Sequence, residues 1–159
     1  GIGEARPDLL CLGKALGAGV PASAVVMRRV VAEAAWAQGP VEPAHTSTHL
    51  GAPVASAGVL HALMRLERDE AMVLDAATAW HRDLEAFVDG TSWQLRGTGL
   101  LWALDSGVDG AGFTLAGRLL NEHRIAVVPS GPTASGITLY PSATCTGLER
   151  DRFLKSLEN

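Results

Sequence analysis

Residues 7–24 read PDLLCLGKALGAGVPASA, and this stretch decides the expected fold. A short continuous apolar run follows Asp8, which is typical of a buried β-strand. Three glycines and a proline then predict a loop, and Lys14 lies near its start. We therefore expect a buried strand over residues 8–12 that presents a single ammonium group at the beginning of a glycine-rich loop.

The composition is that of a globular protein. The chain has 159 residues, of which 47% are hydrophobic and 19% charged, which is enough for a domain with a core. A net charge of −4 argues against a nucleic-acid or anionic-membrane surface, because such surfaces need clustered Lys and Arg. No apolar run approaches the roughly 20 residues that a membrane helix needs.

The two cysteines, Cys11 and Cys145, lie far apart and form no CxxC pair. This spacing indicates neither a metal knuckle nor a redox pair. Cys11 lies in the apolar run and is expected to behave as a small hydrophobic residue. Free thiols fit a reducing compartment, so we expect a cytoplasmic protein.

The rest of the chain alternates short strands with amphipathic helices. Thr146 and Glu149 form the capping box T-x-x-E, which predicts the start of the last helix. The first third is expected to be α/β and the remainder α+β. The expected strands cover residues 8–12, 24–27, 93–96, 100–105, 125–128 and 137–140, and the expected helices cover 30–38, 54–70, 71–89, 113–122 and a segment ending at 157.

Three roles of Lys14 can be considered, and its neighbours exclude one of them. It can be a lysine that extends from a strand end into water. A Walker phosphate loop is excluded, because Asp8 occupies its first glycine position and Ala15 its hydroxyl position. It can also be a Schiff-base lysine, whose amine becomes nucleophilic when burial or a nearby charge lowers its pKa.

Two segments resemble the class III aminotransferases, which are pyridoxal-phosphate enzymes of fold type I. Residues 7–26, PDLLCLGKALGAGVPASAVV, are similar to the family's cofactor-lysine segment, K-(A/G)-L-G-x-G-x-P with its preceding apolar run. Residues 45–63, HTSTHLGAPVASAGVLHAL, are similar to the pattern H-x-(S/T)-T-(aromatic)-x-G-N-P-(apolar)-A-x-A-A. Residues 95–105, 124–131 and 137–146 resemble later strands and a turn of the family more loosely.

The resemblance implies a fold and a set of site residues. The chain would be the C-terminal portion of such an enzyme, with residues 1–64 completing the large mixed-sheet cofactor domain and residues 65–159 forming a small α+β domain. Lys14 would form the internal aldimine with pyridoxal phosphate. Thr48 would bind the cofactor phosphate, usually across the subunit boundary, so a homodimer with shared sites is expected. An amino donor and a keto acceptor would be the substrates.

His45 and His49 suggest one alternative for the second segment. On a helix their spacing would place two imidazoles on one face, as in some metal sites. The intervening Thr-Ser-Thr is a poor helix, and neither a third ligand nor the glutamate of H-E-x-x-H is present. We therefore expect no metal. Arg96 lies at the end of an expected strand, where a structural role is expected.

The chain departs from the family pattern in several places. It is less than half the family's length, and the part before residue 7 would carry the aspartate, the stacking aromatic residue and the glycine-rich turn that hold the cofactor. Ala52 replaces the usual Asn, His49 an aromatic residue, and Ser142 a proline. Thr138 stands where many members that act on α-amino acids carry a carboxylate-binding Arg, which favours an ω-amine or amino-sugar-like donor.

Two other functions stay open. The chain can be a truncated, non-catalytic remnant that acts as a binding or dimerisation module. A racemase, mutase or decarboxylase is also compatible, because the lysine motif is shared and a fold does not fix a reaction.

Overall fold

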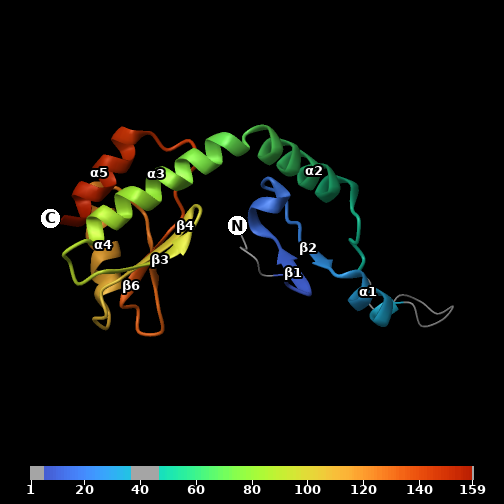
Figure 1. Ribbon diagram of the computed structural model, residues 1–159, viewed down its shortest axis with the longest axis horizontal. Coiled ribbons are helices and arrows are strands. Elements are labelled where there is room, and N and C mark those ends of the chain that lie inside the picture. Colours follow the sequence, from blue (N-terminus) through green and yellow to red (C-terminus); the bar gives the residue numbers. More distant parts are fainter. Residues whose placement is uncertain (1–5, 37–46, 159) are drawn as a thin grey trace. The chain divides into compact units, whose positions relative to one another are not determined.

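The computed structural model describes residues 6–36 and 47–158. The chain divides into two compact units, one that ends at Asp69 and one that begins at Glu70. Figure 1 shows the elements of both units in sequence colours. The result is a mixed α/β chain, as the pattern of strands and helices predicted.

The N-terminal unit is built around two short strands. Strand β1 pairs antiparallel with β2, so that Leu9 lies opposite Met27 and Leu12 opposite Ala24. Between the strands lies one turn of 3-10 helix, where the sequence predicted a loop (Figure 1). The elements are β1 (Leu9–Leu12), the 3-10 helix η1 (Lys14–Gly17), β2 (Ala24–Met27), α1 (Arg29–Trp36) and α2 (Pro53–Arg68).

The expectation that the first strand is buried is wrong for this chain. Leu9 is 53% exposed and Leu12 is 36% exposed, and Cys11 is exposed as well. Among the described strands β1 hydrogen-bonds to β2 alone, and a two-stranded sheet has too little surface to bury a strand. Cys11 therefore does not behave as a buried hydrophobic residue here.

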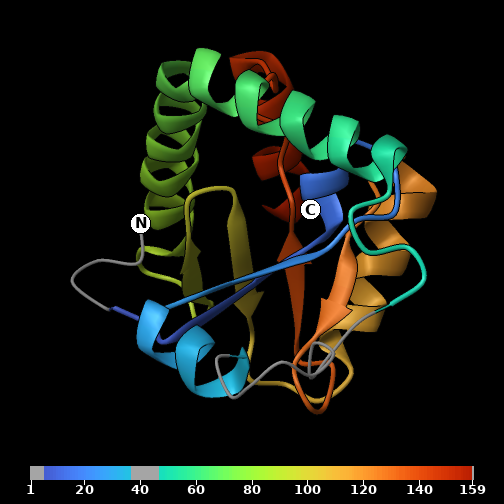
Figure 2. The ribbon, with the colours of Figure 1, turned by 90° about the vertical axis from the view of Figure 1, so that its right-hand side faces the viewer.

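The C-terminal unit is a four-stranded antiparallel sheet with three helices. The strand order is β3-β4-β6-β5. Helix α3 lies along β3, and α4 lies along β5 and β6. Helix α5 contacts both α3 and α4 (Figure 2). The elements are α3 (Glu70–Val88), β3 (Gln94–Thr98), β4 (Leu101–Asp105), α4 (Ala111–His123), β5 (Val128–Ser130), β6 (Gly136–Leu139) and α5 (Gly147–Glu158).

The core of this unit follows from alternation along the two central strands. Successive strand residues point to opposite faces, so every second residue can pack against the helices. Trp102 and Leu104 of β4 lie opposite Leu139 and Ile137 of β6, and all four are buried. The helices contribute the remaining buried apolar side chains, Trp80, Leu84, Leu115, Leu119 and Phe153.

Strand β5 begins three residues later than predicted. Arg124 has a left-handed φ of 57° after α4, and the N–H of Ile125 donates to the carbonyl of Leu119 at 3.0 Å. That N–H completes the helix end and cannot join the sheet. Pairing therefore starts at Val128, which lies opposite Thr138.

Strand β3 also extends beyond its predicted end at Arg96. Gly97 continues the strand opposite Trp102, with φ of 139°. A side chain there would overlap the backbone of Leu101 and Trp102, so glycine permits the close approach of β3 and β4. The sequence suggested a break at this glycine, whereas the chain turns at Gly99, which has φ of 63°.

The capping box at the start of α5 is confirmed. The N–H of Thr146 donates to Oε2 of Glu149 at 2.8 Å, and the N–H of Glu149 donates to Oγ1 of Thr146 at 3.3 Å. These reciprocal bonds satisfy two backbone donors that a helix start leaves without partners. The Glu149 carboxylate accepts hydrogen bonds from the N–H and from the hydroxyl of Thr146, and these bonds lower the pKa of Glu149 below its ordinary value.

Gly112 should be essential for packing α4 on the sheet. An added Cβ would overlap the carbonyl oxygen of Gly136 and lie 2.7 Å from that of Ala134. We expect Gly112→Ala to lower the free energy of unfolding by about 1–3 kcal/mol in urea titrations. Gly117→Ala is the matched control on the same helix, with no atom within 4 Å of the new methyl group. Equal stability of the two variants would contradict this account.

Candidate active site

Lys14 lies at the first position of η1, separated from β1 by Gly13. The turn is closed by backbone bonds from Leu16 to Gly13 at 3.0 Å and from Ala18 to Ala15 at 3.1 Å. The Lys14 side chain is exposed, so the residues described here do not supply the burial that a Schiff-base lysine can use. The loop does present a primary amine to whatever lies next to it.

The backbone of Lys14 is in the left-handed region, with φ of 50°. This conformation is unfavourable for a residue that carries a Cβ, and such residues concentrate at functional sites. Gly13 before it is extended, with φ of −168°, so the backbone conformation changes sharply between these two residues. The conformational cost falls on the same residue that the sequence analysis singled out for its chemistry.

Helix α2 supports this turn from one side. Gly58 of α2 approaches so closely that a Cβ there would lie 2.5 Å from the carbonyl oxygen of Gly17. Gly17 is buried, and it faces Ala22 as well. The turn with Lys14 is therefore in contact with Ala22, in the segment before β2, and with α2.

Thr48 lies in the turn that leads into α2. The N–H of Leu50 donates to the carbonyl of Ser47 at 3.1 Å, and that of Ala52 donates to His49 at 3.1 Å. Thr48 is exposed, so its hydroxyl and backbone N–H can meet a ligand. No hydrogen bond joins Lys14 to Thr48 in the part of the chain that the structure describes.

The histidine pair of the metal alternative lies only partly within the described residues. His45 lies outside them, and His49 belongs to the turn rather than to a helix. Within residues 6–36 and 47–158, no group of three or more His, Cys, Asp or Glu side chains is placed to hold an ion.

Thr138 belongs to the other unit, on β6. It lies opposite Ala103 of β4 and Val128 of β5. It lines a cavity of about 320 Å³, whose wall is mainly apolar and whose charged members are Glu149 and Arg152. This cavity has the size of a small-molecule pocket.

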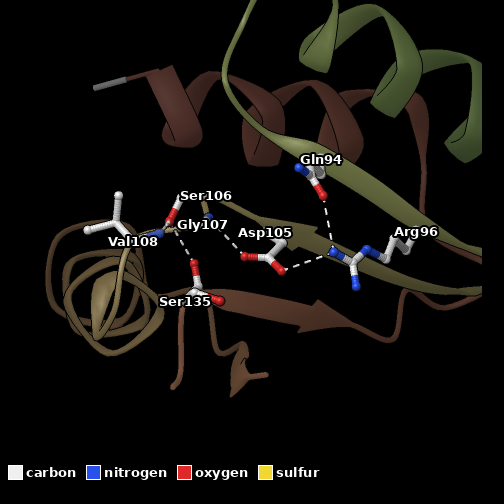
Figure 3. Close-up of polar contacts among 7 residues, drawn as sticks. All are labelled: Gln94, Arg96, Asp105, Ser106, Gly107, Val108 and Ser135. Carbon is white, nitrogen blue, oxygen red and sulfur yellow. Dashed lines mark hydrogen bonds and ion pairs between the residues drawn. The ribbon is translucent and has the colours of Figure 1, made fainter. Parts of the chain in front are cut away.

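A polar cluster at the end of β4 was not predicted from the sequence (Figure 3). Asp105 accepts a hydrogen bond from the N–H of Gly107 at 2.9 Å, and Arg96 of β3 approaches the same carboxylate at 3.4 Å. Arg96 also donates to Gln94 at 3.1 Å. The signal that could have revealed it is the run Asp-Ser-Gly directly after a strand, which favours a turn.

The neighbouring serines complete the cluster. Ser106 Oγ donates to the carbonyl of Ser135 at 2.7 Å and accepts from the N–H of Val108 at 3.2 Å (Figure 3). The Gly107 N–H holds the pKa of Asp105 below its usual range, and the Ser135 hydroxyl and Arg96 act in the same direction. These bonds fix the connection from β4 to α4, which is a structural role.

The comparison with protein families decides the identity of the fold. The model of the family "Aminotransferase class-III" matches residues 2–159. The chain belongs to this family. Class III aminotransferases depend on pyridoxal phosphate, and this chain matches part of solved fold type I transaminase structures.

Individual relatives agree with the family match. The chain is 27% identical to an alanine–glyoxylate aminotransferase 2-like protein of Drosophila melanogaster, over 93% of this chain and 32% of that protein. It is 33% identical to isoleucine 2-epimerase of Lentilactobacillus buchneri, over 67% of this chain and 22% of that protein. It therefore spans about a third or less of these curated relatives.

A solved structure shows the same arrangement of elements. An amine transaminase from an uncultivated Pseudomonas species, in its PLP-bound internal aldimine form, superposes with a TM-score of 0.75 at 27% identity. The match covers 96% of this class III chain and 37% of that structure. Among the helices of the described residues, none is long and apolar enough to cross a membrane.

The left-handed conformation of Lys14 can be tested through stability. Lys14→Gly and Lys14→Ala both remove the amine, but only alanine keeps the Cβ that makes this conformation unfavourable. We expect the glycine variant to be more stable than the alanine variant by about 1 kcal/mol in thermal unfolding. Ala15→Gly is the control, since Ala15 is not left-handed and glycine should destabilise it. A less stable Lys14→Gly would contradict the assigned backbone geometry.

The Asp105 cluster predicts sensitivity to acid. Because the pKa of Asp105 is lowered in the folded state, its contribution to stability is present above the unfolded pKa and is lost as the pH falls toward the folded pKa. The urea concentration at the unfolding midpoint should decrease as the pH is lowered from about 5 to about 2, and Asp105→Asn should make this decrease smaller. Asp109→Asn, at an exposed aspartate nearby, should leave the decrease unchanged. Identical profiles for the two variants would exclude this role.

Proposed function

We propose that this chain is the C-terminal part of a pyridoxal-phosphate-dependent transaminase, in which Lys14 is the cofactor lysine. Residues 1–64 would complete the cofactor domain, and residues 65–159 would form the small domain. The observation that carries the proposal is the position of Lys14, in a left-handed backbone conformation at the start of η1, in a chain that matches the family model over residues 2–159. A cytoplasmic location is part of the same proposal.

The groups present fit two parts of pyridoxal phosphate. The exposed primary amine of Lys14 fits the aldehyde, and the hydroxyl and backbone N–H of Thr48 fit the phosphate. When bound, the cofactor supplies an electron sink for the pair of electrons left on the substrate carbon. The sequence contains two lysines, Lys14 and Lys155, and the second belongs to α5 of the other unit.

Lys14 would serve as the proton carrier of the reaction. Its Nζ, as the free amine, can take the proton from the donor carbon that bears the amino group and return it during transfer. Thr48 would orient the cofactor by donating hydrogen bonds from its hydroxyl and its backbone N–H to a phosphate oxygen. We propose that Thr48 does this across the boundary of a homodimer.

Thr138 bears on the choice of substrate. A hydroxyl cannot replace the bidentate, charged contact that an arginine makes with a carboxylate. We propose that the amino donor lacks an α-carboxylate near this position, as an ω-amine or amino-sugar-like compound does, and that the amino group passes to a keto acceptor.

An isomerase of the same fold is the second candidate. The relative that favours it is isoleucine 2-epimerase, at 33% identity. Both reactions need the lysine as a base, so Lys14 keeps its role in either case. A requirement for a keto acceptor distinguishes them, because an epimerase returns the proton to the same substrate and transfers no amino group.

Reductive trapping tests the role of Lys14. The chain is incubated with pyridoxal phosphate and reduced with borohydride, and the labelled peptide is identified by mass spectrometry. We expect the pyridoxyl group on Lys14 in the wild type, and no lysine label in Lys14→Arg. Lys155→Arg is the matched control, and it should retain the full label.

The same experiment addresses Thr48 and the binding-module alternative. Thr48→Val should require more cofactor for half-maximal labelling, because it loses a phosphate donor. Equal labelling of Lys14 and Lys155, or none at either, would mean that this chain does not form a selective cofactor site. The non-catalytic module would then be the better account.

A further inference from the structure

The backbones of α2 and of the turn that carries Lys14 approach each other closely at Gly58 and Gly17. A Cβ on Gly58 would lie 2.5 Å from the Gly17 carbonyl oxygen and 3.6 Å from Cβ of Val20. The oxygen concerned is already in use, since it accepts the N–H of Val20 at 3.0 Å. A methyl group at position 58 would therefore press on a hydrogen-bonded atom of the backbone.

The turn has little free space around Gly17, which is buried. A Cβ added to Gly17 itself would lie 3.2 Å from Cβ of Ala22 and 3.3 Å from its N, which is tighter than ordinary van der Waals contact. Gly17 is therefore enclosed by Ala22 as well as by Gly58. Either η1 or α2 has to shift when Gly58 acquires a side chain.

We propose that Gly58 is a positioning residue for Lys14. Gly17 ends the four-residue turn that Lys14 begins, so a displaced Gly17 carries the lysine backbone with it. The effect of Gly58 on cofactor binding rests on the proposed function. The effect of Gly58 on the position of Lys14 does not, because it can be measured in the protein without ligand.

The placement of Lys14 can be read without cofactor by NMR. Reductive methylation with ¹³C-formaldehyde labels the two lysine side chains, and Lys14→Arg assigns their signals. We expect Gly58→Ala to shift the dimethyl signal of Lys14 and to leave that of Lys155 unchanged. Gly117→Ala, the same substitution in a helix where nothing lies within 4 Å, should move neither signal.

Labelling by pyridoxal phosphate gives a second readout on the same variants. Because a displacement of about 1 Å can cost about 100-fold in a positioned reaction, we expect at least a tenfold slower trapping at Lys14 in Gly58→Ala. Circular dichroism establishes that the variant is folded. Alanine is the better helix former, so a loss of fold would come from the contact and not from helix propensity.

A double variant keeps the test decisive if Gly58→Ala does not fold. Ala22→Gly removes the Cβ that lies next to Gly17 and so gives the turn room to move, and Gly58→Ala with Ala22→Gly should fold with Lys14 displaced. The proposal would be overturned if a folded variant, single or double, shows an unshifted Lys14 signal and traps the cofactor at the wild-type rate. It would also be overturned if the double variant stays unfolded. Absence of trapping at Lys14 in the wild type would instead remove the proposed function, while the NMR shift would still test the positioning.

Discussion

The N-terminal unit depends on the approach of two backbones at Gly17 and Gly58, where no side chain fits. Such a contact fixes position more strictly than packed side chains do, because side chains can change rotamer and a peptide group cannot. Here it fixes a strained residue, Lys14, whose left-handed conformation needs support from its surroundings. The strained residue, Lys14, and the contact that supports it, between Gly17 and Gly58, thus lie within η1 and the adjacent helix α2.

Much of the architecture was predictable because local patterns determine it. The capping box at Thr146 and Glu149, the apolar stripe of α3 and the run before Lys14 each act through neighbours in the sequence. The misplaced start of β5 has a different origin, since the hydrogen bond of Ile125 to the end of α4 competes with strand pairing. The pattern of hydrophobic residues alone does not indicate whether a backbone N–H donates to the end of a helix or to a neighbouring strand.

The candidate site residues could be named from the sequence, but their surroundings could not. Lys14 and Thr48 were selected through motifs and stay predictions, and the structure places both on exposed turns of one unit. The burial expected around the lysine is absent from the residues described, because burial depends on which segments pack together. The Asp105 cluster was missed because it forms between Asp105, Arg96 and Ser135, which are brought together by strand pairing and a return of the chain.

The uneven distribution of buried side chains has a consequence for the chain's dynamics. All buried apolar side chains of the described segments lie between Trp80 and Phe153. Amide protons of β1 and β2 are thus protected by a sheet with little apolar cover, and those of β4 and β6 by a closed core. Hydrogen exchange in the lysine-bearing hairpin therefore proceeds through local opening, at a lower free energy than the global unfolding that exposes the central strands.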